Sequence, residues 1–216
     1  LLVVSEDINL VDATSELRLA GNSQLIQTHT ENSKVIGAGS LFIDQDSPIE
    51  STYRYNYMSS PVTSSGNTFV IEDVLKDGTN PTSASSIRKD INFIGGYNGN
   101  ADSDPIAIAT YWIYTYASAN GAGSNWTQKG STNTIPATDG YTFKGPGIAQ
   151  NYTFVGTPND GNLTTAVGAN EVYLVGNPYP SAISAKKFIE DNINSLNQGT
   201  LYFWQHAGEE DITSSN

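Results

Sequence analysis

The chain is poor in the residues on which most catalytic and metal centres are built. Among 216 residues there are no cysteines, one methionine and two histidines. Zinc sites and thiol nucleophiles therefore lack their usual side chains, and no G-x-S-x-G nucleophile elbow is present. His29 lies in a threonine-rich turn and His206 follows an aromatic run, settings typical of surface residues. We therefore expect a chain that is not an enzyme.

Positive charge is also scarce. Only 15% of the residues are charged, and 10 lysines and arginines face 22 aspartates and glutamates, which gives a formal net charge of -12. Binding to nucleic acids or to anionic membranes requires basic patches, so neither is expected as a partner. No apolar run approaches the roughly 20 residues that cross a bilayer. We therefore predict neither a nucleic-acid partner nor membrane insertion.

What the chain has in abundance is serine, threonine, asparagine, 20 glycines and 12 tyrosines. Neutral polar residues together with tyrosine are typical of extracellular all-β proteins, whereas helical proteins carry more alanine, leucine, glutamate and lysine. The opening LLVVSEDINL has neither a methionine nor a basic segment, so it does not read as a signal peptide. We expect an all-β chain that is a piece of a longer precursor.

Residues 1–50 contain short β-type runs separated by turn formers and by no helical segment. Leu17 and Leu19, like Leu41 and Ile43, alternate with polar residues, which predicts one buried face. Such strands suit the terminal coils of a parallel β-solenoid, and a meandering antiparallel sheet is the alternative. The six runs are 1–4, 8–11, 16–19, 24–28, 34–36 and 40–43.

The sequence pattern changes after residues 44–48, a run of polar residues that ends in proline. Tyr53, Tyr55 and Tyr57 alternate along one strand, and further strands are separated by long polar connections. This pattern predicts that residues 51–216 form a β-sandwich or jelly-roll-like domain with one or two short helices. An internal similarity suggests that this domain is truncated at its C-terminal end. The strands expected are 69–71, 91–94, 107–116, 141–144, 152–155, 172–175 and 200–204, and the helices are 72–76 and 184–193.

Several segments of residues 51–206 resemble one known family. YRYNYMSSPV, DPIAIATYWIYTY, GYTFKGPG, NYTFVGTPNDG, YLVGNPYPSAISAKKFIEDN and GTLYFWQH follow one another in this order. They resemble secreted, adhesin-like cell-surface proteins of Bacteroidota that are exported by the type IX secretion system. There, such a module lies between a solenoid region and the C-terminal sorting domain. The resemblance implies an extracellular, surface location and no established catalytic activity.

A run of hard oxygen ligands suggests calcium. Asn98, Asn100, Asp102 and Asp104 occupy every second position of YNGNADSDP, and Ca²⁺ takes six to eight oxygens from such loops. Ordinary turn chemistry explains the same residues, because asparagine, aspartate and glycine are common turn formers. Calcium is therefore the expected cofactor if one is bound.

Aromatic strands suggest a second kind of site. In YWIYTY an unbroken strand would place three rings on one face, and Tyr111 and Ile113 on the other. Exposed rings can stack on sugars, but tyrosine and tryptophan also simply favour strands. The candidate carbohydrate-binding residues are Trp112, Tyr114, Tyr116 and Trp204.

The stretch NPYPSAI could be a ligand loop or a corner of the fold. Pro178 and Pro180 fix φ and remove two backbone donors, so no sheet ladder continues through them. Ser181 can cap the turn that follows. We interpret the stretch as a strand-to-helix corner.

Together these features predict a non-enzymatic secreted module that is a structural or adhesive part of a larger surface protein. Its partners would be the rest of the same polypeptide and a polysaccharide or a neighbouring cell surface. The alternative is a carbohydrate-binding domain of a secreted polysaccharide-utilising protein.

Overall fold

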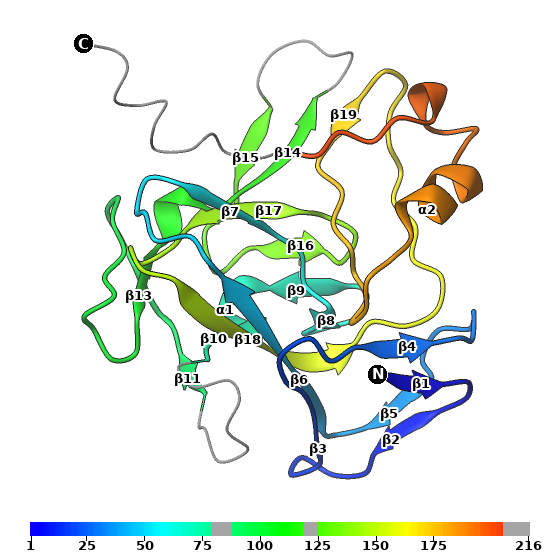
Figure 1. Cartoon of the computed structure of the whole chain (residues 1–216), viewed down its shortest axis with the longest axis horizontal. Coiled ribbons are helices and arrows are strands. Elements are labelled where there is room, and N and C mark those ends of the chain that lie inside the picture. The colour runs from blue at the N-terminus through cyan, green and yellow to red at the C-terminus, as the bar shows by residue number, and fades with distance from the viewer. Residues whose placement is uncertain (79–87, 119–124, 205–216) are drawn as a thin grey trace. The chain divides into compact units, whose positions relative to one another are not determined.

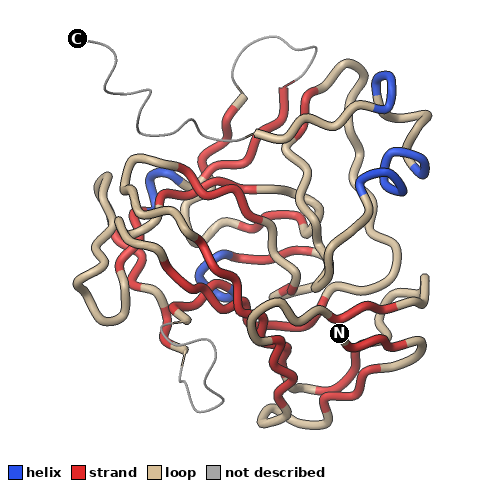
Figure 2. Tube along the Cα trace, viewed as in Figure 1, coloured by secondary structure: helices blue, strands red, loops and turns tan. Residues whose placement is uncertain are grey.

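A computed structural model of the chain describes residues 1–78, 88–118 and 125–204 (Figure 1). The chain divides into two compact units, Leu1–Ala182 and Ile183–Asn216. Strands greatly outweigh helices among the described residues (Figure 2), as the all-β prediction requires. The second unit contains helix α2 (Ala185–Asp191) and a 3-10 turn at Asn197–Gly199. The sequence predicted a domain boundary at residue 50, between a solenoid end and a sandwich domain. The first unit contains residues on both sides of that position, and the domain boundary stays a prediction.

Residues 2–47 pass twice through three strands. Each strand of the second pass pairs in parallel with the corresponding strand of the first, for example Leu2 with Leu25 and Ile8 with Val35. An antiparallel meander is therefore wrong for this segment. The first pass consists of β1 (Leu2–Val4), β2 (Ile8–Leu10) and β3 (Glu16–Leu19), and the second of β4 (Leu25–Gln27), β5 (Val35–Gly37) and β6 (Ser40–Ser47).

Leucines and a glycine hold the two passes together. Leu10, Leu25 and Leu41 are buried in the apolar core. Gly37 has a φ of +97°, and a Cβ there would lie 1.9 Å from the Leu10 carbonyl oxygen. Only glycine tolerates both this conformation and this close approach between passes.

Strand β6 is longer than expected and leaves the two passes. It was predicted to end at Ile43, before the run DQDSP, but it continues to Ser47 and pairs antiparallel with β18 (Gln150–Pro158). The prediction failed because Asp44 is buried and bound by residues distant in sequence. Its carboxylate accepts bonds from Arg18 Nε at 3.2 Å and Thr153 Oγ1 at 2.8 Å.

Two larger sheets form most of the first unit beyond the two passes, and the first of them also includes β3 and β6. The first has the order β11-β10-β18-β6-β3, with β8 also paired to β18, and the second has the order β15-β14-β17-β7, with β19 paired to β14. The new strands are β7 (Tyr55–Met58), β8 (Val62–Thr63), β10 (Leu75–Asp77), β11 (Lys89–Asp90), β14 (Tyr114–Ser118), β15 (Trp126–Gln128), β17 (Tyr141–Lys144) and β19 (Val172–Tyr173).

The core lies where these two sheets meet. Phe143 of β17 packs edge-on against Tyr152 of β18, with ring centroids 5.4 Å apart. Tyr141 and Phe69 continue the contact at 5.7 Å, and all four rings are buried. The smaller elements are the pairs β9 (Thr68–Val70) with β16 (Thr134–Pro136) and β12 (Asn92–Ile94) with β13 (Ala107–Ala109), and helix α1 (Ile71–Val74).

Two predicted strands differ from the structure. The run 107–116 was expected to be continuous, but a 3-10 turn at Thr110–Trp112 separates β13 from β14. Residues 200–204 are described and form no strand there. The 3-10 turn changes how the aromatic side chains of this segment are arranged.

Candidate functional site

The outward face of the sheet β15-β14-β17-β7 is lined by aromatic side chains. Directly paired residues on antiparallel strands share one face. Tyr57 pairs with Thr142, Thr142 with Tyr114, and Tyr116 with Trp126. The alternate residues Asn56, Thr115 and Phe143 are buried on the inner side. We call the outward side the aromatic face; its rings on these strands are Tyr55, Tyr57, Tyr114, Tyr116 and Trp126.

The 3-10 turn adds two rings to this face, and a loop adds a third. Tyr111 was expected opposite Trp112, but its ring lies 4.7 Å from that of Trp112 and 6.4 Å from that of Tyr114. The prediction was wrong because a 3-10 turn breaks the two-residue alternation of a strand. Tyr97 joins them, 4.8 Å from Tyr111, and its carbonyl accepts a 2.6 Å bond from Trp112 Nε1. Nothing in the sequence marked Tyr97, because a loop carries it into contact.

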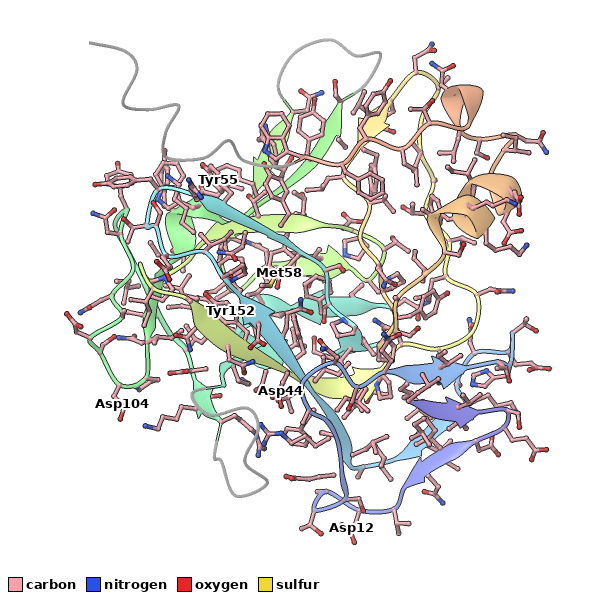
Figure 3. All side chains as sticks on the ribbon, viewed as in Figure 1. Asp12, Asp44, Tyr55, Met58, Asp104 and Tyr152 are labelled. Atoms are coloured by element: carbon pink, nitrogen blue, oxygen red, sulfur yellow. The ribbon has the colours of Figure 1, made fainter. Side chains whose placement is uncertain are left out.

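Lys144 lies within the aromatic face. Its Nζ is 3.6 Å from the ring centroid of Trp112 and 4.9 Å from that of Tyr55, in cation–π contact with both. Burial lowers the pKa of the Lys144 ammonium. Tyr55, labelled in Figure 3, stands directly opposite Lys144 in the sheet register. Among the described residues Lys144 makes no ion pair, since none of the seven ion pairs there includes it.

Exposure decides which rings can meet a ligand. Tyr97 is 62% exposed, Tyr111 40% and Trp126 42%, whereas Trp112 is half-buried beneath Lys144. Trp112, Tyr114 and Tyr116 thus lie on one face, as expected, but the more accessible rings are their neighbours. Trp204, 71% exposed, belongs to the unit Ile183–Asn216 and is described only within it.

The expected calcium ligands lie in an exposed loop, and part of their oxygens serve the loop itself. Asn100 Oδ1 accepts a 2.9 Å bond from the backbone N–H of Asp102. Asp104, at the edge of the fold in Figure 3, forms an ion pair with Lys89. Asn98 is exposed as well, and the described residues contain no convergent group of three or more acidic, histidine or cysteine side chains. Calcium stays a prediction.

Buried acids elsewhere hold the backbone and neighbouring side chains. Asp77 accepts bonds from Ile106 N and Gln150 Nε2, each at 3.0 Å. Asp139 accepts a bond from the hydroxyl of Tyr173. Burial raises the pKa of Asp139, which that bond opposes, and burial raises the pKa of Tyr173 to about 12. These carboxylates are engaged in structural bonds.

The two histidines contribute no catalytic arrangement that the structure describes. His29 Nδ1 lies 2.8 Å from the carbonyl oxygen of Glu31, so its ring helps to shape a turn. His206 lies outside the described residues. Two small clefts of about 230 and 290 Å³ fall just below the roughly 300–1,000 Å³ of usual small-molecule sites.

A different element is bonded to the outer side of each part of the second pass. The N–H of Leu25 in β4 donates to the Pro180 carbonyl at 2.9 Å. The N–H of Ser33 and of Lys34, entering β5, donate to the carboxylate of Asp160, at 3.1 and 2.5 Å. β6 is closed along its length by β18. Among the described residues, the first pass has no strand on its outer side, because β1, β2 and β3 each pair with a single strand.

NPYPSAI is therefore a corner that closes an edge. Besides the bond to Pro180, the amide of Asn159 donates to the Pro178 carbonyl at 2.8 Å. The hydroxyl of Tyr179 donates to the Gly161 carbonyl at 2.7 Å. The expected cap was wrong: Ser184, not Ser181, caps α2, and its hydroxyl accepts a bond from Lys187 N. No helix in the described part is long and apolar enough to cross a membrane.

Comparison with known proteins gives one match, to a protein family. No curated protein and no solved structure matches it. Residues 97–216, more than half of the chain, match a family described as a domain of unknown function, DUF8693. The matched region begins at Tyr97 and includes β14, β17 and the NPYPSAI corner. The chain therefore belongs to the family of domain of unknown function DUF8693.

Proposed function

We propose that the chain is a non-enzymatic module that ends a parallel β-solenoid within a larger secreted cell-surface protein. The observation that carries this proposal is the asymmetry of the two passes. The second pass is bonded on its outer side by Pro180 at β4, by Asp160 just before β5 and by β18 along β6, whereas β1, β2 and β3 pair on one side only among the described residues.

The asymmetry is what the end of a solenoid requires. Each coil of a solenoid stacks on its neighbours, and an open edge at the end invites pairing with other molecules. The two passes act as the last two coils, and residues 51–182, in a sandwich or jelly-roll arrangement, act as the cap. The open side receives the preceding coil of the same polypeptide.

The cellular setting follows from the family resemblance of residues 51–206. It supports secretion through the type IX system, placement at the bacterial cell surface and adhesion to polysaccharide or to neighbouring cells. The composition agrees, because the chain is rich in tyrosine and neutral polar residues and poor in basic ones.

Adding a coil tests the capping function. A copy of residues 1–23 placed before Leu1 keeps the spacing by which Leu2 pairs with Leu25. We expect the copy to stack on β1–β3, to slow amide exchange in these strands and to raise the melting temperature. The control carries asparagine in place of Ile8 and Leu10 in the copy, which then cannot bury its apolar face. If both insertions leave β1–β3 equally unprotected, the proposal fails.

Carbohydrate binding is the second candidate, and the aromatic face favours it. Tyr97 and Tyr111 offer exposed, adjacent rings, and the face is open rather than enclosed, which suits a polymer chain. On a glycan array we expect one class of glycan to bind and Tyr111→Ala to abolish that binding. An array with no bound glycan would remove this candidate and leave the capping function untouched.

A further inference from the structure

We infer that the aromatic face binds an acidic polysaccharide, with Lys144 receiving the carboxylate of a uronic acid residue. This inference rests on the carbohydrate-binding candidate of the proposed function and names its ligand class.

The first support is the pairing of charges. Acidic residues outnumber basic ones by 22 to 10, and all ten basic residues lie in the described part of the chain. Seven of them form ion pairs with a carboxylate there. The three that do not are Arg54, Lys129 and Lys144, and Lys129 acts electrostatically on Asp139. In so acidic a chain, a basic side chain without a carboxylate partner is an exception.

The second support is the setting of Lys144. It pairs with Tyr55 across the sheet. Lys144 is partly desolvated between the rings of Tyr55 and Trp112. A bound carboxylate would supply the missing anion in a partly dry setting, where a charge-assisted hydrogen bond is strong.

The third support is the position of the exposed rings beside the cation. Tyr111 contacts Trp112 at 4.7 Å, and Tyr97 contacts Trp112 at 6.1 Å, while Lys144 covers the Trp112 ring at 3.6 Å. A uronic acid carries an apolar C–H face and a carboxylate on the same ring, which matches stacking next to an ammonium. A neutral sugar leaves Lys144 uncompensated, and an acidic peptide offers no rigid C–H face.

Calorimetry with the full chain tests the inference. The probes are an oligogalacturonate, its methyl ester as the neutral match, and poly-glutamate as an acidic peptide. We expect the oligogalacturonate to bind, the ester to bind about tenfold more weakly or worse, and high salt to weaken the first binding. Poly-glutamate should bind no more tightly than the ester.

Matched variants locate the site. Lys144→Gln should weaken oligogalacturonate binding about tenfold, the scale of one lost charge-assisted contact, whereas Lys144→Arg should retain most of it. Lys34→Gln makes the same charge change within the first unit, on the second pass, where Lys34 pairs with Asp7, and should have no effect. Circular dichroism confirms that each variant is folded.

The outcomes distinguish binding of an acidic polysaccharide from carbohydrate binding in general. If the oligogalacturonate and its methyl ester bind equally, or if Lys144→Gln binds as tightly as wild type, the preference for an acidic ligand is wrong. Carbohydrate binding itself would still be supported. Equal binding of poly-glutamate overturns the role of the sugar ring. Binding to no polysaccharide at all overturns both the inference and the second candidate function.

Discussion

Asp139 is a carboxylate whose ionisation the fold opposes. It is buried two residues before β17, and the hydroxyl of Tyr173 donates to it. Burial raises its pKa above the usual value despite that bond. A raised pKa means that the stability linked to the neutral form is complete at low pH and is lost as the pH rises through the folded-state pKa.

Asp139→Asn should therefore stabilise the protein at neutral pH. The amide removes the charge but keeps an oxygen that can accept the bond from Tyr173. We expect thermal unfolding to show a melting temperature a few degrees higher than wild type at about pH 7, and no difference near pH 3. Tyr173→Phe is the contrast, because it leaves the buried carboxylate without its donor and should destabilise at neutral pH. A variant no more stable than wild type at pH 7 would contradict this reading.

Gly37 gives a second test at the residue scale. Gly37→Ala would place a methyl group 1.9 Å from the Leu10 carbonyl oxygen at a φ of +97°. We expect a loss of at least about 1–3 kcal/mol in the free energy of unfolding, measured by urea denaturation. Gly95→Ala is the control, because nothing lies within 4 Å of the added Cβ and its φ is not positive. Equal effects of the two substitutions would show that the passes do not approach as closely as described.

The residues of the aromatic face show what a sequence can reveal about a site. Alternation correctly placed Tyr114 and Tyr116 on one face because both lie in β14, and Trp112 shares that face although it lies in the 3-10 turn. The partners Tyr97, Tyr111 and Lys144 required knowledge of the turn and of the register between β7 and β17. Local sequence encodes neither.

At the scale of elements, β6 joins the two passes to the larger sheet. Its Asp44 is held by Arg18 of β3 and Thr153 of β18, so one carboxylate ties three strands together. Arg18→Ala should cost about 3–5 kcal/mol of unfolding free energy, because it leaves a buried charge without its partner. Denaturant unfolding of Arg18→Ala and of the double variant Arg18→Ala/Asp44→Asn checks this. The double variant should recover part of the loss; if it does not, the cost has another origin.

The strands of residues 1–50 could be predicted closely, whereas their surroundings could not. All six runs correspond to strands within a residue or two at each end, except that β6 continues through four polar residues. The ends of the six strands could be predicted because glycine and asparagine mark the ends of strands. The extension of β6 could not, because it depends on Arg18 and Thr153, which lie 26 and 109 positions from Asp44. The same limit applies to 107–116, whose break arises from tertiary packing.

At the scale of the whole chain, the closed and open edges determine how copies can associate. Within the two passes that the structure describes, the first pass is the one with no partner on its outer side, so two copies can join open edge to open edge, a symmetric contact that stops at a dimer. Asp160→Ala removes the acceptor of Ser33 N and Lys34 N and frees the outer side of the chain where it enters β5. Open edges of both kinds then permit head-to-tail stacking, which does not close.

Sedimentation velocity of Asp160→Ala measures this. We expect species larger than a dimer that grow with concentration, whereas wild type stays at or below a dimer. Asp104→Ala is a suitable control, because it also removes one carboxylate, yet that carboxylate bonds to the side chain of Lys89 and not to the backbone of a pass. Larger species in the control as well would mean that lost charge, not an exposed edge, causes association.

The double membership of β6 also has a mechanical consequence. Leu41 pairs with Gly156 at the end of the β6–β18 ladder where the passes lead into β6 and where the chain leaves β18. Tension between the passes and the residues that follow β18 therefore acts on one end of this antiparallel ladder and opens its hydrogen bonds one by one, as when a hairpin is peeled. Asp44, bonded to Arg18 and Thr153, lies three pairs into the ladder. Under the proposed function, this carboxylate would be the first point at which the cap resists a pull on the stalk.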